Sequence, residues 1–105
     1  MQVEPGYDAL AKILQLALDQ AQVGKGKERH ANGRPFDKQP IMLIGRMVGT
    51  GYNVGQAMKK AQEAMRMEPA RAQTELLGAI NYLASAYLLL EENRSREATC
   101  GSSQT

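Results

Sequence analysis

Basic residues and glycines gather in one short segment of this chain. Residues 24–38, GKGKERHANGRPFDK, contain five of the thirteen Lys and Arg residues, the only His and three of the ten Gly residues. Glycine lets backbone N–H groups approach a ligand closely because no Cβ intervenes. Lysine ammonium groups add charge, and arginine can grip phosphate oxygens through paired hydrogen bonds. The segment therefore predicts a site for a compact anion.

Each polar side chain of the predicted site has an expected role. Four cations are expected to hold phosphate groups: Lys25, Lys27, Arg29 and Arg34. Two neighbours are expected to contact a sugar or a base: His30 and Asn32. Tyr52 and Asn53 are expected to close the other side of the site, because the backbone N–H groups at a helix start favour an anion. The alternative is that residues 24–38 form a solvated linker, and the segment lacks the Gly-Lys-Ser/Thr ending of a Walker A loop.

The sequence gives little support for catalysis or for a bound metal. His30 is the only histidine and Cys100 the only cysteine, so a zinc site is not expected. Nothing near His30 in the sequence resembles a nucleophile that it would activate. We therefore expect a binding protein without a cofactor rather than an enzyme.

Charge and hydropathy restrict the compartment and the partner. The net charge is +2, of which residues 24–38 carry +3 and the rest of the chain −1, so the basic character is local. A single cysteine favours a reducing compartment, and the first residues do not resemble a secretory signal. The longest nearly apolar stretch, residues 79–90, is shorter than the roughly 20 residues that span a bilayer. We expect a cytoplasmic protein that binds an anionic small molecule and does not enter a membrane.

Apolar spacing and helix breakers predict an all-α fold, a small bundle of about four helices with a long basic loop between the first and the second. The expected helices are residues 7–23, 40–48, 54–67 and 69–93, with Asn53 as the N-cap of the third. Lys59 and Lys60 are expected on or near the solvent side of that helix. The two long helices are expected to pack antiparallel. Residues 1–93 then form one domain, and residues 94–105 a flexible polar tail.

The last helix predicts self-association. Leu76, Ile80, Leu83, Tyr87 and Leu90 follow a four-and-three spacing, and Leu88 adds apolar surface on another side. A helix that is apolar nearly all round is central or shared with another subunit. We therefore expect a homo-oligomer, most simply a dimer, that forms through this helix.

Two other functions fit parts of the sequence. Residues 41–64 are similar to a helix-turn-helix, whose second helix would present four polar residues to a major groove: Asn53, Gln56, Lys59 and Lys60. Gly55 would weaken such a recognition helix, and nucleic acid is not the favoured partner. An inhibitor of a host protein would need neither the loop charges nor these lysines.

Two resemblances add context. The segment TELLGAINYL resembles the Glu-Leu-Gly-Asp-Val segment of the all-α nucleotide pyrophosphohydrolases, which hold magnesium between paired carboxylates. Here Glu75 is present, but Gly78 and Ala79 stand where the partner acid is expected. The stretches KGKERHANG, QPI and ELLGAINYLA resemble small helical proteins of tailed phages and prophages. That resemblance implies a protein that acts by binding in the host cytoplasm, and the function expected here is sequestration, without cleavage, of a nucleotide-derived signal of bacterial immunity.

Overall fold

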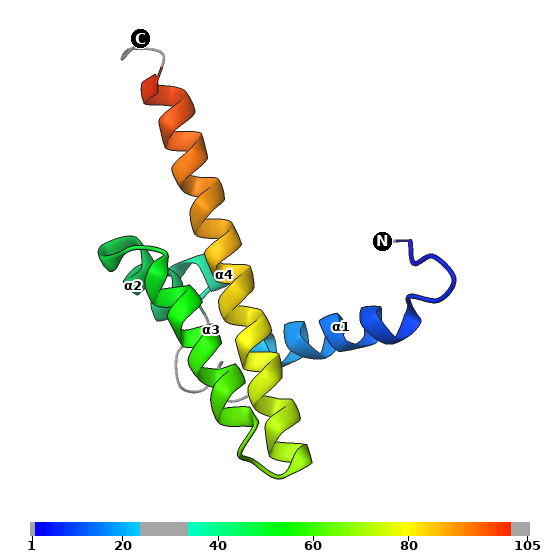
Figure 1. The fold of residues 1–105 in the computed structure, drawn as a ribbon. Helices are drawn as coiled ribbons and strands as arrows, with labels where there is room; N and C mark the ends of the chain where they lie inside the picture. The colour runs from blue at the N-terminus through cyan, green and yellow to red at the C-terminus, as the bar shows by residue number, and fades with distance from the viewer. Residues whose placement is uncertain (1, 24–33, 102–105) are drawn as a thin grey trace.

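The computed structural model describes residues 2–23 and 34–101. All regular structure in these two ranges is helical, as predicted, and it comprises the helices α1 (Asp8–Val23), α2 (Pro40–Val48), α3 (Gly51–Ala64) and α4 (Pro69–Gly101) with the 3₁₀ turn η2 (Phe36–Lys38) (Figure 1). The basic loop predicted between the first two helices lies mostly in residues 24–33, outside the described residues.

Local sequence signals define several of the helix ends. Pro40 occupies the first turn of α2, where its missing N–H costs nothing. Gly49 ends that helix with φ of +106°, a backbone conformation that residues with a side chain rarely adopt. The Glu68 carboxylate accepts a hydrogen bond of 2.8 Å from the Arg71 N–H and thereby caps the start of α4. These boundaries confirm the predicted positions.

The predicted start of the third helix is wrong. α3 begins at Gly51, directly after Gly49 and Thr50, and the Asn53 N–H already donates to the Thr50 carbonyl at 3.0 Å. Asn53 is therefore not an N-cap. Its side chain lies inside the bundle, where it donates 2.8 Å bonds to the Ile41 carbonyl and to Ser85 Oγ. The hydrogen-bond partners of Asn53 lie on other helices, so the sequence around Asn53 could not predict its burial.

The last helix also extends past its predicted end. α4 continues to Gly101 rather than ending at Asn93, so residues 94–101 of the predicted polar tail are helical. Arg94, Arg96 and Glu97 are favourable helix formers, and neither proline nor glycine occurs between Asn93 and Gly101. Polarity at this end of the chain indicates exposure to solvent rather than the end of the helix.

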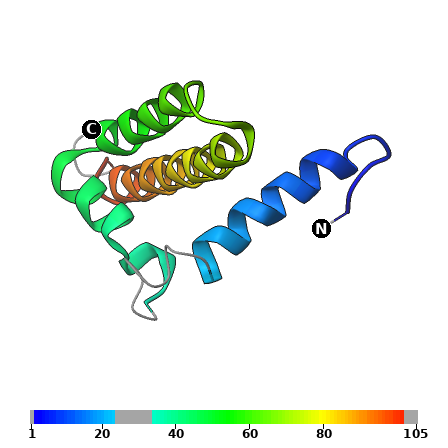
Figure 2. The ribbon, with the colours of Figure 1, turned by 90° about the horizontal axis from the view of Figure 1, so that it is seen from below.

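α3 and α4 form an antiparallel pair, and α2 crosses one end of it (Figures 1 and 2). Small residues line the contact between the pair, with Ala57 and Ala64 on α3 and Ala79 and Ala86 on α4 all buried. Because alanine lets two helices approach closely, α3 rather than the first helix packs antiparallel against α4. The prediction that the first and last helices pack antiparallel is wrong.

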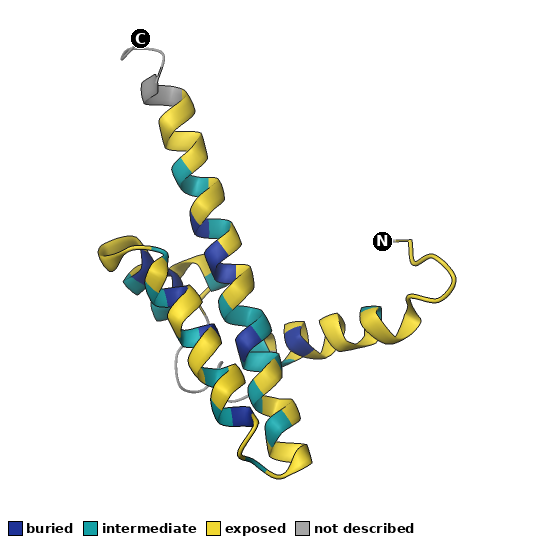
Figure 3. Ribbon diagram, viewed as in Figure 1, coloured by how far each residue is buried: buried dark blue, intermediate teal, exposed yellow. Residues whose placement is uncertain are grey.

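α1 leaves the body of the protein at a steep angle (Figures 1 and 2). Its C-terminal half alone is tied to α4, through bonds from the Asn81 amide to the Ala17 carbonyl (3.0 Å) and from the Gln20 amide to the Thr74 carbonyl (3.1 Å). Most large apolar side chains of α1 remain exposed (Figure 3). None of the described helices combines the length and the apolar character that crossing a membrane requires.

Candidate functional site

A cleft of about 460 Å³ lies where the end of α1, the start of α2, and the facing sides of α3 and α4 meet. Its walls combine aromatic rings, side-chain amides and one ion pair. The residues that line it are Gln20, Ala21, Phe36, Gln39, Pro40, Ile41, Ile44, Tyr52, Lys60, Thr74, Glu75, Gly78, Asn81 and Tyr82. A volume of this size is typical of small-molecule sites, which span roughly 300 to 1,000 Å³.

Two tyrosines form the aromatic wall of the cleft. The rings of Tyr52 and Tyr82 meet edge to face, with centroids 6.2 Å apart and planes at 76°. Burial, helped by the neighbouring Tyr52 hydroxyl, raises the pKa of Tyr82 to about 12. Tyr82 is therefore a neutral phenol at neutral pH, with a hydroxyl that can both donate and accept.

Lys60 supplies the cationic group of the cleft. Its Nζ lies 3.5 Å from Glu75 Oε2 and 5.9 Å from the centroid of the Tyr82 ring. The lysine and the glutamate are both half-buried. A Cβ at Gly78 would lie 3.2 Å from the Lys60 chain, so the glycine leaves room for this chain along the wall. The arrangement holds an ammonium group over an aromatic face with a carboxylate beside it.

Three amides line the cleft and are oriented by backbone carbonyls. Asn81 and Gln20 donate across to α1 and α4 in the bonds described above, and Gln39 donates to the Arg34 carbonyl at 3.1 Å. An amide offers two donors and a carbonyl oxygen, so one bond of this kind fixes its orientation without using its full capacity. Such groups can read the edge of a base or a sugar.

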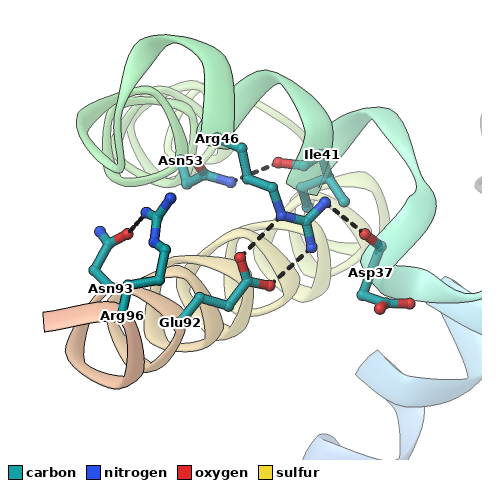
Figure 4. A network of polar contacts seen from close by, with 7 residues as sticks. All are labelled: Asp37, Ile41, Arg46, Asn53, Glu92, Asn93 and Arg96. Atoms are coloured by element: carbon teal, nitrogen blue, oxygen red, sulfur yellow. Dashed lines mark hydrogen bonds and ion pairs between the residues drawn. The ribbon is translucent and has the colours of Figure 1, made fainter. Parts of the chain in front are cut away.

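A network of polar contacts ties α2 to the neighbouring helices (Figure 4). Arg46 donates to both oxygens of Glu92, at 2.9 and 2.8 Å, and to the Asp37 carbonyl at 2.8 Å. Its hydrogen bonds hold the pKa of Glu92 below the ordinary value and raise the pKa of Arg46. The contact joins η2, α2 and α4. Together with the bond from Asn53 to the Ile41 carbonyl, it fixes the wall that carries Gln39 and Ile41.

The structure brings together only some of the predicted site residues. Tyr52 lines the cleft. Arg34 is exposed. It lies beside the cleft because its carbonyl accepts the hydrogen bond from Gln39. Asn53 is fully buried and contacts other helices, so its assignment to the binding surface is wrong. The remaining predicted residues lie outside the described ranges: Lys25, Lys27, Arg29, His30 and Asn32.

The ends of the basic segment meet the cleft. Ala21, near the end of α1, and Phe36, at the start of η2, both line it. Ala21 precedes residues 24–38 by three positions, Phe36 lies near their end, and Gln39, which also lines the cleft, follows them directly. The chain therefore enters and leaves that segment at the walls of the cleft.

Sequence reasoning missed Lys60 and Tyr82 as residues of the site. Lys60 was expected on or near the solvent side of its helix. It is half-buried and lines the cleft, because it shares a face with the buried Ala57 and Ala64, three residues before it and four after. Tyr82 stands four residues from Gly78 and from Ala86. In each case, small residues three or four positions away on the same helix face flank a large polar residue. This pattern could have indicated that Lys60 and Tyr82 face another helix.

The described residues bear on two other functions. Among them, no group of three or more His, Cys, Asp or Glu residues could hold a metal ion. Glu75, the acid of the pyrophosphohydrolase-like segment, is paired with Lys60. Of the four side chains that a helix-turn-helix would present to DNA, Asn53 is buried, Gln56 is half-buried and Lys60 lies in the cleft, which leaves Lys59 exposed. This placement does not favour DNA recognition by α3.

No protein-family model, curated protein or solved structure matches this chain, so the candidate site rests on its own geometry.

Proposed function

We propose that the cleft binds a phosphorylated, nucleotide-like small molecule and retains it without cleaving it. The observation that carries the proposal is that an aromatic wall, three oriented amides and Lys60 meet in one cleft. Residues at both ends of the basic segment line the same cleft. In the proposed role the protein acts in the cytoplasm of a host cell. The resemblance to phage proteins makes nucleotide-derived signals of bacterial immunity the first ligands to test.

The aromatic and amide groups suit the base and the sugar of such a ligand. Tyr52 and Tyr82 offer ring edges and hydroxyls. The amides of Gln20, Gln39 and Asn81 supply donors and acceptors in fixed directions. A mostly apolar cleft with a few placed polar groups is the usual form of a small-molecule site.

The phosphate end of the ligand is assigned to the cations. Lys60 lies inside the cleft, and the positive end of the α2 dipole is at the same wall, where Pro40 and Ile41 begin the helix. Six residues of the basic segment are proposed to complete the site: Lys25, Lys27, Arg29 and Arg34 on the phosphates, with His30 and Asn32 towards the sugar or base. A bound phosphate would compete with Glu75 for Lys60.

Retention of an intact ligand is part of the proposal. Glu75 is the one carboxylate among the described residues that line the cleft, and it already pairs with Lys60. Hydrolysis of a phosphate ester or anhydride by magnesium would require several carboxylates around the metal. The cleft as built favours binding over phosphoryl chemistry.

Calorimetry against cyclic dinucleotides and ADP-ribose derivatives tests the proposal. Lys60→Ala should weaken binding at least tenfold, because a charge-assisted hydrogen bond contributes roughly 1.5 to 3 kcal/mol. Arg29→Ala and Arg34→Ala should have effects of the same size. Lys59→Ala is the matched control, since this neighbouring lysine is exposed and does not line the cleft. Glu75→Gln should strengthen binding, because it removes a negative charge beside the phosphate.

Two results would overturn the proposal. The absence of heat with every ligand of these classes would remove the binding function. If a ligand binds but is recovered as hydrolysis products after the protein is denatured, the proposed retention of an intact ligand is wrong, although binding itself is supported.

We also propose that the binding protein is a homo-oligomer that forms through α4. Large apolar side chains on this helix, Leu83, Tyr87 and Leu90 among them, are more than half exposed in the single chain. Burying them against another subunit would be favourable by about 25 cal/mol for each Å² of apolar surface.

A further inference from the structure

α4 carries an apolar seam that no other part of the described chain covers. Leu76, Ile80, Leu83, Tyr87 and Leu90 repeat at intervals of four and three residues, the spacing of a coiled-coil seam. Four of them, all except Ile80, are 43 to 67% exposed. The residues of α4 that are buried, such as Ala86 and Leu89, form a different face, the one that packs against α3 and α2. The seam is thus a second packing face with the pattern that fits another helix.

A second apolar seam runs along α1, and only its C-terminal half is covered by the same chain. Tyr7, Leu10, Leu14, Ala17 and Ala21 repeat at three and four residues. Ala17 is buried at the contact of α1 with α4 of the same chain. Tyr7, just before the helix, is 57% exposed. Leu10 and Leu14 are 55 and 48% exposed and belong to the N-terminal half of α1, which projects away from the body (Figures 1 and 2). The N-terminal half of this seam therefore extends beyond the contact with α4 and is exposed to solvent.

The exposed area matches what a stable dimer buries. The chain of 11.5 kDa exposes 7965 Å², whereas a compact monomer of this mass exposes about 5,800 Å². Its radius of gyration is 15.9 Å, against about 13 Å for a compact domain of this length. A standard interface removes about 800 Å² from each partner, and obligate dimers remove more. The excess of about 2,200 Å² is therefore enough for an extensive interface.

We infer that a second copy of this chain covers both seams, and that the projecting half of α1 in each copy packs against the α4 seam of the other. An α4–α4 contact would leave Leu10 and Leu14 exposed, and an α1–α1 contact would leave Leu83 and Leu90 exposed. The reciprocal α1–α4 contact covers both faces in both copies about a single two-fold axis, and so closes the assembly as a dimer. This inference rests on the proposed homo-oligomer and names the helix that its α4 face binds; it does not depend on the ligand.

Small and apolar flanks favour this contact. Ala84 stands beside the seam on α4, and Ala11 and Leu18 stand beside the seam on α1. Alanine beside a seam lets the backbones approach, and leucines of the other helix fill the space. Charged residues of α1 lie on its opposite side, where Lys12 and Asp19 are exposed. The α1 side of the pairing therefore buries no charge.

Cross-linking between two differently tagged copies tests the pairing. Both copies carry Cys100→Ser, which removes the only native cysteine. One copy carries Leu10→Cys and the other Leu83→Cys, or Leu90→Cys to sample a second register, and the coexpressed copies are treated with a short bismaleimide. We expect a covalent dimer that contains one copy of each. If instead each variant links only to itself, or if no pair links, the reciprocal contact is wrong even when light scattering shows a dimer.

Charge variants measure the same contact without a cross-linker. Leu10→Glu or Leu14→Glu should raise the dimer dissociation constant at least tenfold, because the carboxylate would be buried without a partner. Both positions are exposed in the single chain, so circular dichroism should show unchanged helix content. Lys12→Glu on the polar side of α1 is the control and should leave the dissociation constant unchanged. A wild-type monomer at 100 µM in light scattering would overturn both the homo-oligomer and its α1–α4 contact.

Discussion

Replacing Gly45 by alanine tests whether the close approach of α2, α3 and α4 is as the structure has it. A Cβ at this position would lie 2.4 Å from Asn53 Oδ1 and 2.4 Å from Leu89 Cδ1. Asn53 is 0% and Leu89 3% exposed, and Asn53 is held by two hydrogen bonds, so neither side chain can move aside freely. Gly45→Ala should therefore overpack the contact.

Gly55 provides the matched control for this substitution. It also lies inside a helix, α3, but a Cβ there would meet nothing within 4 Å. Alanine in place of glycine in a helix interior is favourable by about 1 kcal/mol, so Gly55→Ala should stabilise the protein by about that amount. Gly45→Ala has the same backbone gain but an overpacking cost of about 1 to 3 kcal/mol. The difference between the two variants isolates the contact.

Thermal unfolding at one fixed protein concentration measures that difference. In a domain of this size 1 kcal/mol corresponds to roughly 4 to 8 °C. Gly45→Ala should thus melt at least about 4 °C below Gly55→Ala. Equal melting temperatures for the two variants would show that Asn53 and Leu89 do not crowd Gly45, and would refute the packing of α2 described above.

Two further predictions concern the polar groups around the cleft. Asn53→Ala removes the donor to Ile41 and Ser85 and should lower the free energy of unfolding by about 1 to 3 kcal/mol; urea denaturation would contradict this if the loss were no larger than that of Gln62→Ala, an exposed change on the same helix. Tyr82 has a pKa raised to about 12 in the folded protein against about 10 in the unfolded chain, so the unfolded state loses this proton first as the pH rises. Stability from this group is fully present below pH 10 and is lost as the pH rises towards 12. Tyr82→Phe should reduce that loss and Tyr7→Phe, at an exposed position, should not; an unchanged pH profile in Tyr82→Phe would show that the ring is not buried as described.

Local sequence determined most of the helices. The start of α2 at Pro40, its end at Gly49 and the start of α4 at Pro69 depend on residues that act within one turn, through a missing donor, a positive φ or a capping carboxylate. The all-α class follows from apolar spacing, which depends only on the helical period. Tyr52, which lines the cleft, was predicted for the site from another local feature, the turn between two helices.

The tertiary structure alone decided which faces meet. Lys60 lies in the cleft and Asn53 in the core because α3 packs against α4 along a row of alanines, and the local pattern does not show which helix offers the matching row. Because α3 occupies the antiparallel position beside α4, α1 does not pack there as expected. Several apolar faces in one chain can bury one another in different combinations, and the combination depends on side-chain volume across the contact rather than on spacing along the chain. For this reason the sequence determined the helices, while their packing determined the cleft.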